Sequence, residues 1–114
     1  MVDFNKMPCI YWNDRMKIEW LERYIIIHSI IYYELNENVI SDKEFDSCSK
    51  QLLKLSREHK EIFRNSEYFY IFSDFDANTG FYIWDRLKKS DKEKLKRIAL
   101  SVIKNKKGEK SNGN

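Results

Sequence analysis

Residues 32–46 read YYELNENVISDKEFD, and this stretch decides the fold because it closes one predicted helix and opens the next. Asn36-Glu37-Asn38 interrupts the helical pattern that comes before it. Ser41 and Glu44 then form a capping box, in which the serine side chain accepts a backbone hydrogen bond and the glutamate reaches back to the cap. The stretch therefore predicts two helices joined by a short connector, an arrangement in which the helices lie antiparallel.

Apolar residues before and after the connector repeat at steps of three and four, which is the helical period. In the first segment they are Leu21, Tyr24, Ile27, Ile31 and Leu35, and in the second they are Phe45, Cys48, Leu52 and Leu55. Asn13 or Asp14 can cap the first helix, because a short side-chain oxygen accepts from an unpaired backbone N–H. We expect helices at about 14–36 and 42–57, the first of them buried on more than one side.

The C-terminal half carries further helix signals. Residues 66–75 are rich in aromatic side chains, residues 76–80 have the composition of a turn, and residues 81–87 fit a short helix or a strand. A second Ser-Asp-Lys-Glu tetrapeptide at 90–93 is expected to cap a final helix that ends near Ile103. The predicted fold class is therefore all-α: a small helical domain built on an antiparallel two-helix unit, with additional C-terminal helices.

The composition is that of one folded domain. The chain has 114 residues, of which 42% are hydrophobic and 15% aromatic, with only three glycines and one proline. These values argue against disorder and against a β-sandwich or barrel, which needs frequent turns. The formal charge of +3 lies entirely in residues 104–114, which hold four lysines and one glutamate. We expect residues 1–103 to form a single helical domain and residues 104–114 to form a flexible, disordered basic tail that contacts nucleic acid only weakly.

Signatures of enzymes, metal sites and membrane segments are missing from the sequence. There is no glycine-rich phosphate loop, no GxSxG and no HExxH, so we expect no catalytic residues and no enzyme activity. Cys9, Cys48, His28 and His59 lack the spacing of a zinc site; His28 and Cys48 are expected in the core and His59 at the surface. No apolar run is long enough to cross a bilayer. The expectation is a soluble, cytoplasmic protein with reduced thiols and no membrane contact.

One group of residues has the chemistry of a binding site. Tyr32 and Tyr33 close the first helix, while Asp42, Phe45 and Asp46 lie in the first turns of the second. The two aspartates are four residues apart, so they share a helix face that the hairpin brings opposite the tyrosines. Aromatic faces and carboxylates suit a flat, cationic ring that carries hydroxyls. The alternative is structural, since an aspartate stabilises any helix N-terminus and aromatics near a helix end usually belong to the core.

Residues 32–46 also resemble domain Ia, the N-terminal domain of bacterial NAD-dependent DNA ligases. The family pattern is approximately Tyr-Tyr-x-Leu-(Asp/Asn)-x-Pro-x-Ile-Ser-Asp-x-Glu-Tyr-Asp, and the sequence follows it without a gap. The resemblance covers about residues 21–61 and implies a small helical unit that grips the nicotinamide mononucleotide (NMN) half of NAD and closes over an adenylation domain. The residues that it implies as NMN- or NAD-binding are Tyr32, Tyr33, Asp42, Phe45 and Asp46.

The chain departs from that family at several points. Phe45 stands where the family has a tyrosine, and Asn38 and Lys60 replace prolines. No Lys-x-Asp-Gly occurs, so there is no lysine to accept AMP, and residues 62–114 resemble no other part of a ligase. We therefore expect a stand-alone, ligase-like small protein, of a kind that phages encode, which is not a ligase by itself.

Two functions are compatible with these residues. In the first, the module binds a protein partner, such as a host ligase, another host enzyme or a defence nuclease, and inhibits or redirects it, with an NMN or NAD notch that is weak or vestigial. Residues 68–84 would then be the interface, unless their aromatic side chains complete the core. In the second, the chain is a dedicated NMN- or NAD-binding accessory or sensor that works with a separate adenylation domain. Neither function requires a cofactor.

Overall fold

The computed structural model describes residues 12–76 and 82–112 and contains helices but no strand within these ranges. In chain order the elements are α1 (Asp14–Ser29), η2 (Ile30–Glu34), α2 (Asp42–Glu58), α3 (Lys60–Arg64), α4 (Phe69–Phe72), α5 (Ile83–Arg86) and α6 (Lys89–Asn112). The element η2 is one turn of π-helix that continues α1. The all-α fold class is confirmed.

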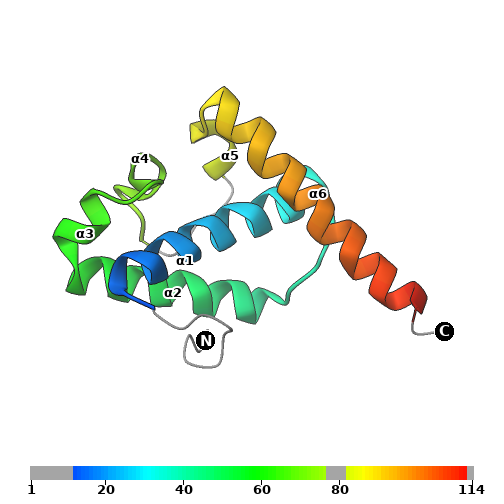
Figure 1. The fold of residues 1–114 in the computed structure, drawn as a ribbon, viewed down its shortest axis with the longest axis horizontal. Helices are drawn as coiled ribbons and strands as arrows, with labels where there is room; N and C mark the ends of the chain where they lie inside the picture. The colour runs from blue at the N-terminus through cyan, green and yellow to red at the C-terminus, as the bar shows by residue number, and fades with distance from the viewer. Residues whose placement is uncertain (1–11, 77–81, 113–114) are drawn as a thin grey trace.

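The helices α1 and α2 lie side by side and antiparallel, joined at one end by η2 and a connector (Figure 1). Both begin at side-chain caps. Asn13 Oδ1 accepts from the backbone N–H of Met16 at 2.8 Å, and Ser41 Oγ accepts from the backbone N–H of Glu44 at 3.1 Å. Such caps satisfy N–H groups that have no partner within the helix. The predicted two-helix unit is therefore present, with its starts at the predicted residues.

Apolar side chains of α1 and η2 form the centre of the core. Those exposed by 1% or less are Ile18, Leu21, Ile25, Ile26, Ile30 and Ile31. They belong to one cluster with Leu52 of α2 and with Leu95 and Ala99 of α6, which crosses α1 and η2 (Figure 1). Because adjacent isoleucines of α1 are buried together, this helix is covered on more than one side, as predicted.

The aromatic segment expected at 66–75 is part of this core. Tyr68 and Phe72 are each exposed by 1%, and Ile83 of α5 is fully buried. The described part of residues 68–84 therefore completes the core, which is one of the two roles that the sequence left open for it. Other aromatic side chains of the segment, among them Phe69, Tyr70 and Trp84, pack against the core and stay partly exposed.

The start of α6 differs from the prediction. The helix begins at Lys89, and the backbone N–H of Lys92 already donates to the carbonyl of Lys88 at 2.8 Å. Ser90 therefore lies inside the first turn and is not the cap, so the second capping box is wrong. The same tetrapeptide caps α2 but not α6, because the position of a cap depends on where the preceding chain leaves the core.

The end of α6 also differs, since the helix continues to Asn112 instead of ending near Ile103. Residues 104–112 are helical, whereas the sequence predicted disorder for them. Lysine and glutamate are good helix formers, and they let a helix run on after its last buried residue. The division into a domain at 1–103 and a flexible tail at 104–114 stays a prediction.

Other sequence expectations meet the structure only in part. The short helix α3 was not predicted from the sequence. The turn expected at 76–80 lies, from residue 77 on, outside the described residues, as does Cys9. Cys48 is a buried free thiol, as predicted. Among the helices described, none combines the length and apolar character needed to cross a membrane.

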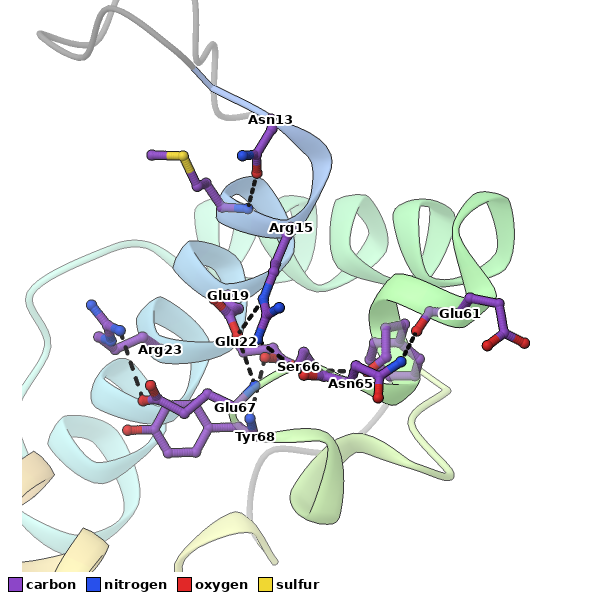
Figure 2. Close-up of polar contacts among 12 residues, drawn as sticks. Asn13, Arg15, Glu19, Glu22, Arg23, Glu61, Asn65, Ser66, Glu67 and Tyr68 are labelled. Atoms are coloured by element: carbon purple, nitrogen blue, oxygen red, sulfur yellow. Dashed lines mark hydrogen bonds and ion pairs between the residues drawn. The ribbon is translucent and has the colours of Figure 1, made fainter.

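One carboxyl group is buried between α1 and the loop that leads into α4 (Figure 2). Glu22 is fully buried; Ser66 Oγ lies 2.7 Å from its Oε2, and the backbone N–H of Tyr68 donates to its Oε1 at 3.4 Å. Burial raises the pKa of Glu22 from 4.5 to about 7, and the nearby carboxylates of Glu19 and Glu67 add to this rise. This carboxyl group fixes the loop to α1.

Candidate functional site

A cavity of about 240 Å³ lies at the end of the α1–α2 hairpin. Its wall is formed by the end of α1, by η2, by the connector and by the first turn of α2. Four of the five residues predicted as a site line it, namely Tyr32, Tyr33, Asp42 and Phe45. The volume is small for a small-molecule site, so it suits one ring system rather than a whole dinucleotide.

The π-helical turn η2 positions the two tyrosines. The backbone N–H of Leu35 donates to the carbonyl of Ile30 at 3.0 Å, a bond that spans five residues instead of the four of an α-helix. Asn36 follows with φ of 53°, a left-handed conformation that asparagine adopts more readily than most residues. A π turn holds one extra residue, so Tyr32 and Tyr33 are rotated away from the positions that a continuous α-helix would give them. The sequence predicted the helix end here but not the π turn.

Tyr32 and Tyr33 stand at the open side of the cavity. Their side chains are 47% and 44% exposed, and their rings meet edge to face with 4.8 Å between the centroids. Ile31, which is 1% exposed, lines the same cavity from inside. The cavity therefore has buried side chains at its inner end and exposed aromatic rings at its mouth, where an incoming flat ring can stack.

The first turn of α2 supplies the opposite wall. Because Ser41 caps the helix, Asp42 is its first residue, and Phe45 lies half-buried one turn further on. Asp46 is not part of the cavity wall. Its Oδ2 lies 3.0 Å from Nζ of Lys50, and both side chains are more than half exposed. The structure thus brings four of the predicted residues together and places the fifth beside Lys50.

His28 also lines the cavity, although the sequence predicted only a packed core residue. The side chain is 8% exposed, and its buried Nδ1 has no hydrogen-bond partner among residues 12–76 and 82–112. Burial lowers the pKa of His28 from 6.5 to about 4, so the imidazole is neutral near pH 7. The signal that could have identified it is spacing, because a residue four before Tyr32 would share its face in a continuous α-helix.

The cavity combines aromatic faces, an aspartate and a neutral imidazole. These groups can stack on a flat ring and hydrogen-bond to hydroxyl and carbonyl groups. Glu37 and Asn38 of the connector add further polar atoms to its wall. In the part of the chain that the structure describes, no group of His, Cys, Asp and Glu residues is arranged to hold a metal ion. The arrangement is therefore suited to an organic ligand with a flat ring.

Comparison with known proteins identifies the class to which this hairpin is similar. Residues 13–66 match the family model described as the DNA ligase-like, N-terminal NAD+-binding domain. This range includes α1, η2, α2, α3 and every residue of the predicted site. The resemblance to ligase domain Ia is confirmed for this part of the chain.

Individual relatives match the same part of the chain. Over 46 residues the chain is 39% identical to the DNA ligase of Buchnera aphidicola subsp. Acyrthosiphon pisum (strain 5A), which is 40% of this chain and 7% of the ligase. Over 63 residues it is 41% identical to the DNA ligase of Bacteroides fragilis, which is 54% of this chain and 10% of the ligase. The match thus spans a tenth or less of these ligases. No solved structure matches the chain.

Proposed function

We propose that this chain is a non-catalytic module that binds the nicotinamide mononucleotide part of NAD, or free NMN, in the cavity at the end of the hairpin. The observation that carries the proposal is that Tyr32, Tyr33, Asp42 and Phe45 line one cavity within the segment that matches the NAD+-binding domain model. The ring of nicotinamide fits between the tyrosines and Phe45, and its positive charge is attracted by aromatic faces and by the aspartate. The ribose hydroxyls can donate to the carboxylate of Asp42.

Binding of this kind is expected to be weak. A ring that stacks on one or two aromatic side chains gains about 1–3 kcal/mol from each contact. The cost of association cancels much of this gain. The resulting Kd lies in the high micromolar to millimolar range. A partner that closes over the exposed side of the ligand would raise the affinity, which is why an accessory or sensor role beside a separate adenylation domain suits the module.

Catalysis is not part of the proposed function, because adenylation requires a nucleophile. Transfer of AMP from NAD needs a nucleophile, and the ligase-type Lys-x-Asp-Gly does not occur in the sequence. The residues around the cavity offer rings, carboxylates and a neutral imidazole, and no lysine is among them. The module is therefore proposed to hold the nicotinamide nucleotide without breaking its pyrophosphate bond.

A chemical-shift titration of the isotope-labelled chain with NMN, NAD and NADH tests the proposal. We expect NMN and NAD to shift the backbone signals of Tyr32, Tyr33 and Asp42 at millimolar concentration, and NADH to shift them less because its ring is uncharged. Tyr32→Ala should weaken binding, whereas Leu100→Ala, which also removes a half-exposed side chain, should not. Unchanged spectra with all three nucleotides would overturn the proposal.

A second candidate function is protein binding, and a specific observation favours a surface for it. Tyr32 and Tyr33 remain 47% and 44% exposed in the structure, and tyrosine is one of the residues that anchor protein interfaces. We propose these two side chains as the contact surface in preference to residues 68–84, because they are more exposed than the described aromatic side chains of that segment. Affinity capture from host lysate with the wild-type chain and with a Tyr32→Ala, Tyr33→Ala double variant tests this. Recovery of the same ligase or defence nuclease with both would refute a role for the tyrosines.

A further inference from the structure

His28 lies at the inner end of the cavity, where it is the least solvent-exposed of the polar side chains in the wall. It is 8% exposed, whereas Tyr32 and Tyr33 at the mouth are nearly half exposed. The ring is held in place by its neighbours on the same helix. Tyr24 packs against it with 4.4 Å between the centroids, and Trp20 stacks on Tyr24 at 4.8 Å. An ordered row of aromatic rings along α1 thus ends at the cavity in an imidazole.

The hydrogen bonding of this imidazole is incomplete within the part of the chain that the structure describes. Among the described residues, Nδ1 is buried and has no hydrogen-bond partner. A neutral imidazole carries one N–H, and a buried N–H without an acceptor costs more than a buried lone pair without a donor. The proton is therefore assigned to Nε2, because on Nδ1 it would be a buried N–H without an acceptor among the described residues. A ring that lines the cavity with this edge presents an N–H donor to it.

We propose that His28 is a specificity-determining residue of the nucleotide site, and that its neutral Nε2–H donates a hydrogen bond to the carboxamide oxygen of nicotinamide. This inference rests on the proposed function. The carboxamide is the uncharged acceptor of the ligand and is attached directly to the ring that stacks between the aromatic side chains. The phosphate and ribose remain at the open mouth, where Asp42 and solvent can meet them.

The hydrogen bond explains why a polar ring occupies an otherwise apolar inner wall. Beside it lie Ile31, which is 1% exposed, and Val39, which packs against the core. A leucine or phenylalanine there would bury more apolar area and leave no unsatisfied nitrogen. The bound carboxamide gives the Nε2–H of His28 an acceptor within the cavity.

The test compares NMN with its analogue that lacks the carboxamide, a pyridinium ribonucleotide, by titration of the full chain and of two variants. A neutral hydrogen bond is worth about threefold to tenfold in affinity. The wild type should therefore bind NMN three to ten times more tightly than the analogue. His28→Phe, which keeps an aromatic ring beside Tyr24, should lose this preference, and His28→Gln, which keeps an N–H donor, should retain most of it.

The outcomes separate the two proposals. If the wild type binds neither compound, the proposed function fails and the role of His28 fails with it. If it binds both compounds equally, or if His28→Phe keeps the preference for NMN, nucleotide binding stands and the hydrogen bond from His28 is refuted. Equal binding of the two compounds by the wild-type chain refutes the hydrogen bond without any variant. A thermal melt of each variant shows whether its substitution impairs folding.

Discussion

Replacing Glu22 by glutamine should alter how the stability of this fold depends on pH. Glu22 is fully buried between α1 and the loop that leads into α4 (Figure 2). Its pKa is raised from 4.5 to about 7, chiefly by burial. The carboxyl group is therefore largely protonated in the folded chain at mildly acidic pH, where it would be ionised in the unfolded chain.

The hydrogen bonds around this carboxyl group agree with a protonated form. Ser66 Oγ lies 2.7 Å from Oε2 of Glu22 and also 2.7 Å from the carbonyl oxygen of Phe63. A hydroxyl has one proton and can donate to only one of these acceptors. When Glu22 carries a proton, it donates to Ser66 Oγ and leaves Ser66 to donate to Phe63, so both contacts become hydrogen bonds. The amide of a glutamine can donate to Ser66 in the same way.

The sign and size of the effect follow from the two pKa values. A carboxyl group whose pKa is higher in the folded chain stabilises the fold fully below pH 4.5 and loses this contribution as the pH rises to about 7. The shift corresponds to roughly 3 kcal/mol. Glutamine does not titrate. Between pH 4.5 and about pH 7, the free energy of unfolding of E22Q should therefore rise relative to that of the wild type by up to roughly 3 kcal/mol. At alkaline pH this would raise the melting temperature of E22Q over the wild type by about 10 °C.

Urea unfolding followed by circular dichroism, at a series of pH values from below 4.5 to above 7, measures this difference. The wild-type profile alone is not decisive, because His28 acts in the opposite sense. Its pKa falls from 6.5 to about 4, so its contribution is lost as the pH falls through that range. The difference between E22Q and the wild type cancels this effect. Glu61→Gln, at an 82% exposed side chain, serves as the control for the loss of a surface carboxylate. Parallel curves for E22Q and the wild type would refute the reasoning.

Three further predictions concern the helix start and the site. Ser41→Ala should lower the free energy of unfolding by about 0.5–2 kcal/mol, because Ser41 Oγ accepts from the Glu44 N–H. Ser90→Ala, inside the first turn of α6, should change it by less than about 0.5 kcal/mol. Equal losses in urea unfolding would contradict the placement of the caps. Phe45→Tyr restores the hydroxyl of the family pattern and should tighten NMN binding about threefold to tenfold in an NMR titration, and an unchanged Kd would mean that the hydroxyl does not reach the ligand. Asp46→Asn should weaken NMN binding. It should not lower the melting temperature, because the ion pair of Asp46 with Lys50 is exposed and contributes at most about 0.5 kcal/mol to stability. Unaltered binding would limit the site to the four predicted residues that line the cavity.

The parts of the fold that the sequence predicts are those with local causes. Asn13 and Ser41 cap their helices with side-chain oxygens that act within three residues, and both starts are where the pattern places them. The tetrapeptide at 90–93 is identical to the one that caps α2, yet Ser90 lies inside α6 and does not cap it. A capping signal states that a helix can begin at a residue, but packing of the preceding segment decides whether it does.

The site follows the same division between local and tertiary causes. Hairpin geometry and the family pattern suffice to bring Tyr32 and Tyr33 opposite Asp42. The π turn is not predictable from the pattern, because it depends on how the chain leaves α1 and enters the connector. The sequence does not identify His28 as a site residue, because a histidine within an apolar helix is expected to pack in the core. Burial alone does not distinguish a packed ring from one that lines a cavity.

Two ionisable residues of α1 show why this helix needs cover on more than one side. Glu22 and His28 are six residues apart, which places them about 120° apart around the helix axis. One contacts the loop before α4, and the other lines the cavity at the hairpin end. Burial moves their pKa values in opposite directions, upward for the carboxyl group and downward for the imidazole, and both groups are therefore neutral near pH 6. If one side of α1 became exposed to solvent, only the residue on that side would regain its ordinary pKa and ionise. The pH dependence of stability in E22Q and in His28→Phe therefore reports separately on the packing of the C-terminal half and on the closure of the site.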